Sequence, residues 1–359
     1  MKIIFWCFTC MLILIGCEDN TTNADQHLNT IRPNYITEAT KHDSDDPAIW
    51  IHPTNPALSL ILGTDKDEDG ALYVYNLEGK IIQNKVIRGL KRPNNIDVAY
   101  GLETSFGIFD IAIVSERLTG KIRIFSLPNL KEIDGGGIAV YVGEKEEEYR
   151  DLMGIAAYHD KQTNKIYVIP GRKNGPKDGT YLWQYELFGD QESKTVKAKL
   201  VRKFGQFSGK KEIEAIAVDN ELGFIYYSDE TIGIRKYHAK PSKGNEELAL
   251  FGTKDFTEDN EGISIYKKDE NTGYILISDQ QRNTFNVYPR EGALNNVHKH
   301  KLICRVPLQT IGSDGNDVTP LSLNKNFKTG LFVAMSESKV FHYYQWEQIE
   351  EFILKNKSK

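Results

Sequence analysis

A six-fold internal repeat constrains the fold of this chain more than any other feature of its sequence. An alternating run with an aromatic residue near its end recurs at Tyr75, Phe125, Tyr185, Tyr237, Tyr288 and Tyr343, with spacings of 50, 60, 52, 51 and 55 residues. Two further strand-like runs precede it in every unit, such as PAIWIHP and LSLILGT in the first. Alternating runs bounded by Gly, Asn and Asp predict β-hairpins. Six such units predict an all-β fold, a six-bladed β-propeller; the rival, an open β-sandwich, does not require so regular a spacing.

Helical periodicity is absent until residues 346–355, where WEQIEEFILK predicts a short helix. The repeated aromatic residues are expected to pack between blades rather than to bind a ligand.

The first residues have the form of a secretory signal. Lys2 is followed by an apolar run over residues 3–15, which is too short for a permanent membrane span. The run ends in Leu14-Ile15-Gly16-Cys17, which resembles a bacterial lipobox, where the cysteine is lipidated and becomes the first mature residue. We therefore predict export, with the protein held by a lipid anchor in the bacterial cell envelope and the outer membrane as its expected location.

Three segments follow from this interpretation. Residues 1–16 are predicted to be a lipoprotein signal peptide, residues 17–31 a flexible polar tether that begins at lipidated Cys17, and residues 32–359 a single propeller domain. Cys304 is then the one cysteine of the domain, which excludes a disulfide framework and a thiolate metal site. The net charge of −5 argues against nucleic acid as a partner. We expect a monomer, because a closed propeller needs no partner.

Charged residues recur at two places in the repeat. Acidic or amide residues precede the first strand of each unit: Asp45, Asp46, Asn94, Asn95, Asp97, Asp151, Glu212, Glu214, Asp259, Asn260, Glu261, Asp314, Asn316 and Asp317. A second set follows the second strand: Asp65, Lys66, Glu116, Arg117, Arg172, Lys173, Asp229, Glu230, Asp279, Gln280 and Glu337. Because equivalent positions of propeller blades surround one channel, both sets are expected to converge on the same mouth.

A mouth with so many carboxylates cannot stay ionised without cations. Ligands that offer only oxygen favour a hard ion, Ca²⁺ before Mg²⁺ or Mn²⁺. Lysine and arginine beside such a site suit a multiply charged anion, with phosphate as the natural candidate. Bound calcium can position and acidify a water, so the two sets suggest metal-assisted phosphoester hydrolysis. Structural calcium with surface ion pairs is the alternative, and the spacing alone leaves both open.

Several motifs, in their order along the chain, resemble the calcium-dependent β-propeller phytases of bacteria. They include DDPAIWIHP (45–53), GTDK (63–66), NNIDVAYG (94–101), SER (115–117), EIEAIAVD (212–219), YYSDE (226–230), DNEGISIY (259–266) and SDGNDV (313–318). The resemblance covers nearly all of the chain after residue 31. It implies a six-bladed propeller with several calcium ions. It also implies a 3-phytase, a hydrolase in which a calcium-activated water attacks one phosphate of myo-inositol hexakisphosphate (phytate) while a neighbouring site holds another.

The resemblance also implies roles for individual residues. Ligands of the active-site calcium cluster would be Asp45, Glu214, Glu230, Glu261 and Asp314; Asp259, from the same acidic repeat, is a further candidate ligand, and Asp46 would bind a structural calcium. Lys66 and Arg117 would bind phosphate, and either Arg172 or Lys173 would supply a third cation. The predicted catalytic set is Lys66, Arg117, Glu214, Glu230 and Glu261.

Two positions depart from the family pattern. Met153 stands where many members carry a tyrosine against the phosphate, and Asp67 follows Lys66 where many have a second lysine. Alternatives therefore include another phosphorylated small molecule as substrate, a calcium-dependent lactonase of propeller fold, and a non-catalytic calcium-binding propeller. A lactonase needs no phosphate-binding cations. The loop Gly209-Lys210-Lys211 is expected to lie on the surface, and residues 144–149 (EKEEEY) are expected to form a solvated loop.

Overall fold

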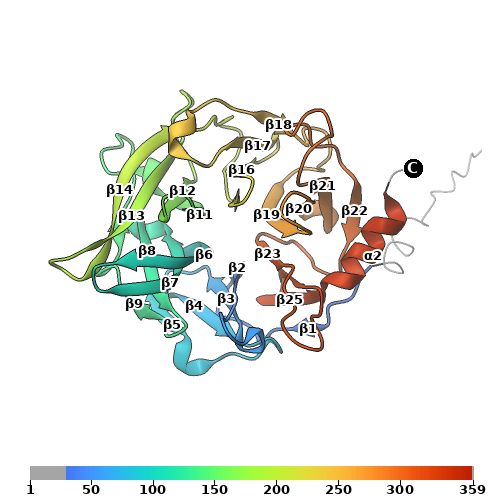
Figure 1. Ribbon diagram of the computed structural model, residues 1–359, viewed down its shortest axis with the longest axis horizontal. Coiled ribbons are helices and arrows are strands. Elements are labelled where there is room, and N and C mark those ends of the chain that lie inside the picture. Colours follow the sequence, from blue (N-terminus) through green and yellow to red (C-terminus); the bar gives the residue numbers. More distant parts are fainter. Residues whose placement is uncertain (1–29, 358–359) are drawn as a thin grey trace, which may run out of the picture. The chain divides into compact units, whose positions relative to one another are not determined.

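The structure is a computed structural model that describes residues 30–357; the predicted signal peptide, Cys17 and the tether up to residue 29 lie outside the described residues. The chain from Ile31 onward forms one compact unit. Its strands make six antiparallel sheets arranged as blades around a centre (Figure 1), which confirms the predicted six-bladed propeller. None of the helices in the described part of the chain is long and apolar enough to cross a bilayer.

The blades follow one another in chain order, and each begins with its innermost strand. Blade 1 has β2 (Ser44–Trp50), β3 (Leu60–Asp65), β4 (Gly70–Tyr75) and β5 (Ile87–Leu90); blade 2 has β6 (Pro93–Thr104), β7 (Gly107–Glu116), β8 (Lys121–Leu127), β9 (Lys131–Glu132) and β10 (Ile138–Ala139); blade 3 has β11 (Leu152–Asp160), β12 (Lys165–Arg172), β13 (Leu182–Asp190) and β14 (Thr195–Phe204). Blade 4 has β15 (Ile216–Asp219), β16 (Phe224–Asp229), β17 (Gly233–His238) and β18 (Ala249–Phe251); blade 5 has β19 (Asn260–Lys267), β20 (Gly273–Asp279), β21 (Thr284–Pro289) and β22 (Cys304–Pro307); blade 6 has β23 (Asn316–Thr319), β24 (Leu331–Ser336), β25 (Val340–Gln345) and β1 (Tyr35–Ile36). Short 3₁₀ turns lie at Pro56–Leu58, Gln83–Lys85, Arg117–Thr119, Glu147–Arg150, Pro241–Lys243 and Gln280–Arg282.

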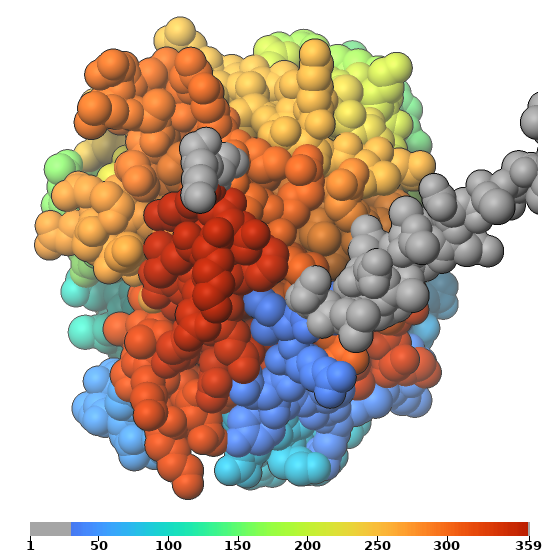
Figure 2. All heavy atoms as spheres, turned by 90° about the vertical axis from the view of Figure 1, so that its right-hand side faces the viewer, coloured from blue at the N-terminus to red at the C-terminus, as the bar shows by residue number. Residues whose placement is uncertain are grey.

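Blade 6 is completed by the beginning of the propeller chain. Tyr35 of β1 pairs with Tyr343 of β25, and Ile36 pairs with His342. The first described residues and the C-terminal residues therefore lie side by side, as the blue and red spheres of Figure 2 show. Ile31, which the sequence placed in the tether, already donates its backbone N–H to the Pro307 carbonyl of blade 5, 2.9 Å away.

The hydrophobic core consists of six clusters, one between each pair of neighbouring blades within the described residues. The repeated aromatic residues are all buried in these clusters, so their predicted packing role is confirmed. The predicted C-terminal helix is α2 (Trp346–Asn356), and it buries Trp346, Ile349 and Ile353, which share one face because three and four residues separate them. Trp346 stacks on Tyr266 of blade 5 with ring centroids 3.6 Å apart, so α2 covers the seam between blades 5 and 6.

Candidate active site

β-Bulges place the acidic residues of the first strands. The strand register shifts between residues 44 and 47 in β2, 93 and 96 in β6, 152 and 155 in β11, and 260 and 263 in β19. A bulge sets two residues opposite one and redirects their side chains. Asp45 and Asp46, neighbours in the first bulge, consequently serve different places: Asp45 contacts the charged mouth, whereas Asp46 lines the central cavity.

Hydroxyl groups fix the bulged segments by bonding from one blade to the next. Each hydroxyl donates to a backbone carbonyl of the next blade. The pairs are Thr64 Oγ1 with Asn94 (2.6 Å), Ser115 Oγ with Met153 (2.6 Å), Ser228 Oγ with Glu261 (2.8 Å) and Ser278 Oγ with Ser313 (2.7 Å). Each donor is the small residue that precedes an acidic residue and a further polar or charged residue at the end of a second strand. The mouth is therefore built across blade boundaries, and its side chains are held by buried backbone contacts.

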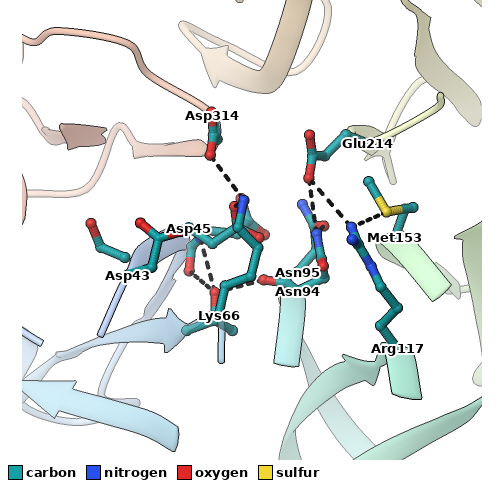
Figure 3. Close-up of polar contacts among 12 residues, drawn as sticks. Asp43, Asp45, Lys66, Asn94, Asn95, Arg117, Met153, Glu214 and Asp314 are labelled. Carbon is teal, nitrogen blue, oxygen red and sulfur yellow. Dashed lines mark hydrogen bonds and ion pairs between the residues drawn. The ribbon is translucent and has the colours of Figure 1, made fainter. Parts of the chain in front are cut away.

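Lys66 bridges two carboxylates at the mouth (Figure 3). Its Nζ lies 2.5 Å from Asp45 Oδ1 and 3.2 Å from Asp314 Oδ2, and Gln280 Nε2 donates to the other Asp314 oxygen at 2.6 Å. Burial lowers the pKa of the Lys66 ammonium, but the nearby carboxylates outweigh burial and hold that pKa above its ordinary value. Lys66 thus remains charged while it joins blades 1 and 6.

Arg117 and Glu214 form a second group on the opposite side of the view in Figure 3. Arg117 Nη2 lies 4.0 Å from Glu214 Oε1, which also accepts a hydrogen bond from Asn94 Nδ2 at 2.9 Å. The guanidinium is fixed from behind, because Nε donates to the Leu152 carbonyl at 3.2 Å and Nη2 contacts the sulfur of Met153. Met153 is fully buried, so the residue that departs from the family pattern supports Arg117 here instead of offering a hydroxyl.

Five carboxylates form two candidate metal-ligand triads that share Glu230. The oxygens of Glu212, Glu214 and Glu230 lie within 4.8 Å of one another, and so do those of Glu230, Asp259 and Glu261. Glu230 Oε1 and Glu261 Oε2 are buried with no hydrogen-bond partner, and so is Asp45 Oδ2 across the mouth. Buried oxygens without a donor are costly unless a cation or a proton satisfies them. The sequence pattern placed Glu212 in the acidic set at the mouth but did not name it as a metal ligand, although its spacing two residues before Glu214 provided the signal.

The crowded carboxylates retain protons when no metal is bound. Burial, together with the carboxylates of Glu214 and Glu212, raises the pKa of Glu230 to about 9. Burial also raises the pKa of Asp45 to about 7, although Lys66 opposes the shift. The pKa of Glu261 lies well above its ordinary value because of burial and the Glu214 and Glu230 charges. A divalent ion at this mouth would therefore displace protons.

The second charged set divides into two rows, which corrects the expectation that all of it converges on the mouth. In each blade the residue after the second strand donates its backbone N–H to a backbone carbonyl in the segment before the first strand. The pairs of donor and acceptor are Lys66 and Asp43, Arg117 and Arg92, Lys173 and Asp151, Glu230 and Glu212, Gln280 and Asp259, and Glu337 and Ile311. These six residues are equivalent, and Lys66, Arg117, Lys173 and Glu230 reach carboxylates of the acidic set. The residues just before them point to the other side, since side chains alternate along a strand. Asp65, Asp229 and Asp279, for example, accept backbone N–H groups of His42, Ser208 and Thr257.

Arg172 belongs to the row that turns away from the mouth. It is fully buried, and its guanidinium donates to the carbonyls of Tyr181, Tyr149 and Thr180 and pairs with Glu144 at 3.2 Å. Lys173 occupies the position equivalent to Lys66, and its Nζ lies 3.2 Å from Glu212 Oε2. The structure thus brings Lys173 to the predicted cluster and leaves Arg172 outside it. Glu144, which lies in the loop that was expected to be solvated, thus forms an ion pair with the buried Arg172.

A pair of substitutions separates these two positions. Arg172→Met should lower the free energy of unfolding by about 3–5 kcal/mol, because it leaves Glu144 and three buried carbonyls without their donor. Lys173→Met should change stability by less than about 1 kcal/mol, since its ion pair is half exposed, and should instead raise KM for the substrate. Urea unfolding and initial-rate kinetics of both variants test this, and equal stability of the two would contradict it.

Asp46 lies apart from the mouth, in a central cavity of about 560 Å³ that the first strands line. Asp46 Oδ2 accepts the Ile96 N–H at 2.9 Å, and Asp97 and Asp317 likewise accept the N–H groups of Ala157 and Ile49 in the next blades. The pKa of Asp46 is raised well above its ordinary value, chiefly by burial, and that of Asp317 to about 7. The structure therefore separates the predicted structural-calcium residue from the predicted active-site ligands.

The retained protons predict how stability depends on pH without metal. Glu230 has a folded-state pKa of about 9, so the folded chain holds a proton that the unfolded chain has released. Stability should fall with rising pH by about 1.4 kcal/mol per unit for each such proton. Between about pH 7 and pH 8 the buried His300 and His342, with pKa lowered to about 4, do not obscure the effect. Urea unfolding in chelator at several pH values should show this slope. Glu230→Gln should reduce the slope by the contribution of about one proton, about 1.4 kcal/mol per pH unit. An unchanged slope in Glu230→Gln would contradict the assignment.

The donor atoms of the mouth fit a hard divalent cation. The two triads offer only carboxylate oxygens, and two of their buried oxygens lack any partner. The fold and this site define a six-bladed propeller whose mouth combines an oxygen-only metal-ligand cluster with lysine and arginine side chains.

Comparisons with known proteins agree with that class. The family model described as Phytase matches residues 12–352. The 3-phytase of Bacillus subtilis (strain 168) is 29% identical over 328 residues, which is 86% of this chain and 81% of that protein. Among solved structures, the Dos1 propeller aligns over 84% of this chain and 67% of that chain with a TM-score of 0.43 and 10% identity, a likeness too weak to add to the argument. The chain belongs to the phytase family, which confirms the resemblance drawn from its motifs and the predicted class of enzyme.

Proposed function

We propose that this protein hydrolyses phosphomonoesters of phytate in a calcium-dependent reaction at the channel mouth. The observation that carries the proposal is the direct contact between the two kinds of group that such a reaction needs. Lys66, Arg117 and Lys173 each reach a carboxylate of the acidic set, across three blades. In a chain of the phytase family, this arrangement supports phosphate binding beside a metal cluster.

Calcium would be held by Glu212, Glu214, Glu230, Asp259 and Glu261 in the two triads and by Asp45 and Asp314 beside Lys66. Bound calcium supplies charge that neutralises phosphate and lowers the pKa of a water that can attack phosphorus. Asp46, in the central cavity, would hold a separate structural ion.

The residues of the chain itself bind and orient the substrate. Arg117 presents a guanidinium that Leu152 and Met153 fix from behind, so its direction is set before substrate arrives. Lys66 and Lys173 are ammonium groups at equivalent positions of blades 1 and 3, and they flank Arg117 of blade 2. Three adjacent blades thus offer cations to phosphate groups of one substrate.

The test is phosphate release from phytate by the domain from residue 31 onward, measured with calcium and with chelator at neutral pH. Release that requires calcium is the expected result. A folded, calcium-binding protein that releases no phosphate from phytate would overturn the proposal. A panel of simpler phosphomonoesters in the same assay shows whether Met153 and Asp67 shift the preference to another phosphorylated substrate.

We also propose that the protein is exported and anchored by lipid at Cys17. The support is the sequence Leu14-Ile15-Gly16-Cys17 after an apolar run. Expression in a bacterial host with a radiolabelled fatty acid should label the protein, and Cys17→Ser should abolish both the label and its recovery with membranes. Membrane recovery of Cys17→Ser equal to that of the parent protein would count against the anchor.

A further inference from the structure

Lys211, in the loop between β14 and β15, extends across a blade boundary to the triad of Glu230, Asp259 and Glu261, called the outer triad below. Its Nζ lies 2.6 Å from Asp259 Oδ1 and 3.6 Å from Glu230 Oε2, while 45% of its side chain is exposed. The exposed position agrees with the expectation that the loop Gly209-Lys210-Lys211 lies on the surface, and none of the motifs quoted above includes Lys211. Its ammonium lies against two of the three carboxylates that could hold a metal ion.

The ammonium satisfies only part of this triad. Glu230 Oε1 and Glu261 Oε2 remain buried without a partner although Lys211 contacts the neighbouring oxygens. A calcium ion bound to Asp259 and Glu230 would lie about 2.4 Å from their oxygens. Two positive charges bound to the same oxygens would repel strongly in this partly buried place. Lys211 and calcium therefore compete for the outer triad.

Asp259 does not depend on Lys211 for its orientation. Gln281 Nε2 donates to Asp259 Oδ2 at 2.7 Å, and the backbone N–H of Asp259 donates to Gln281 Oε1 at 2.8 Å. The carboxylate is thus braced from the side away from the lysine. When the ammonium leaves, Oδ1 becomes available while the side chain stays in place.

A displaced Lys211 has an adjacent place to go. It lines a cavity of about 490 Å³ whose wall carries the cations Arg117, Lys173 and Lys210 together with the carboxylates Glu148, Asp151 and Glu212. In this cavity the ammonium joins Arg117 and Lys173, which are proposed above to bind phosphate, and a flexible four-carbon stem lets it move between the two positions.

We propose that Lys211 is a tethered counter-cation that occupies the outer metal site until calcium displaces it, and that its ammonium then assists in binding the anionic substrate. This inference rests on the proposed function and adds a link between the two ligands. Calcium binding releases Lys211 for the substrate, and the substrate, by holding Lys211 away from Asp259, favours calcium by the same factor.

Calcium titration calorimetry on the chelator-stripped domain without substrate tests the first half of the proposal. Lys211→Met should bind its weakest calcium about 10-fold more tightly than the parent protein, because a charge-assisted contact no longer competes. Lys211→Arg, which keeps the charge, should bind calcium as the parent does. Lys210→Met is the matched control, since its ammonium has no ion pair among the described residues, and its calcium affinity should be unchanged.

Inorganic phosphate as the probe tests the second half. With calcium saturating, Lys211→Met should bind phosphate several-fold more weakly, and adding phosphate should tighten calcium binding less in this variant than in the parent. Calcium affinity of Lys211→Met equal to or weaker than that of the parent would overturn the proposal. Because these readouts measure binding alone, failure of the proposed function would appear separately, as a parent protein that binds calcium and phosphate but releases no phosphate from phytate.

Discussion

Glu230→Gln is expected to lower kcat for phosphate release by at least about 100-fold and to weaken calcium binding. Glu230 is the one carboxylate common to both triads, so this substitution would remove a ligand from each of the two candidate ion positions. Glutamine keeps the size of the side chain but not its charge. The loss is therefore electrostatic rather than a change of packing.

The same substitution should have the opposite effect on the stability of the metal-free protein. Glu230 is buried and lies beside Glu214 and Glu212, and burial together with the repulsion from these carboxylates raises its pKa to about 9. Removing the charge should raise the free energy of unfolding in chelator at pH values above that pKa, while it lowers the stability gained from calcium. An exposed neighbour, Glu258→Gln, is the control and should change stability by less than about 0.5 kcal/mol. A Glu230→Gln variant with parental activity and calcium affinity would remove Glu230 from the site.

Lys66→Met should destabilise the chelated protein by about 3–5 kcal/mol. The substitution leaves Asp45, which is 1% exposed, and Asp314 facing each other without the ammonium that bridges them. Calcium should recover part of this stability because a divalent ion can replace the lost charge. Activity should stay low even in saturating calcium, since the phosphate group would lack its cation in blade 1.

Urea unfolding with and without calcium measures the first effect, and initial rates measure the second. Lys41→Met is the matched control: Lys41 pairs with Asp69 at 3.0 Å, but both side chains are mostly exposed, so its removal should change stability by less than about 1 kcal/mol. If Lys66→Met is as stable as Lys41→Met in chelator, the ammonium is not what holds Asp45 and Asp314 together. In that case a proton shared between the two carboxylates would have to replace it.

The blades could be predicted from the sequence because the strands of one blade follow one another closely in the chain. Tyr75, Phe125 and their equivalents recur at one place in every unit, and burial at a blade interface demands the same kind of residue each time. The completion of blade 6 by β1 could not be read this way. Two residues, Tyr35 and Ile36, carry no periodic signal, and their partner lies about 300 positions away.

The residue types of the candidate site could be predicted from the sequence, but the directions in which some of their side chains point could not. Asp45, Glu214, Glu230, Glu261 and Asp314 do lie at one mouth, as equivalent positions of a ring must. The bulge that sends Asp46 to the central cavity, however, is a feature of strand pairing, which residue types do not reveal.

The choice between Arg172 and Lys173 was open for a similar reason. Both are cationic, and only strand alternation, fixed by the equivalent backbone hydrogen bonds, decides that Lys173 reaches the acidic set. Lys211 was assigned to the surface because a loop lysine usually is solvated. Its contact with Asp259 depends on how blade 4 meets blade 5, which no local pattern specifies.

The pairing of β1 with β25 has a consequence for how the chain matures. During synthesis Tyr35 and Ile36 emerge about 300 residues before their partner strand, Val340–Gln345. Contacts of such long range form slowly and make folding depend on the complete chain. A nascent or truncated polypeptide that lacks β25 leaves β24 with an unpaired edge, which is open to aggregation and to proteases. Ring closure therefore requires translation at least through β25, and until then β1 has no partner strand in blade 6.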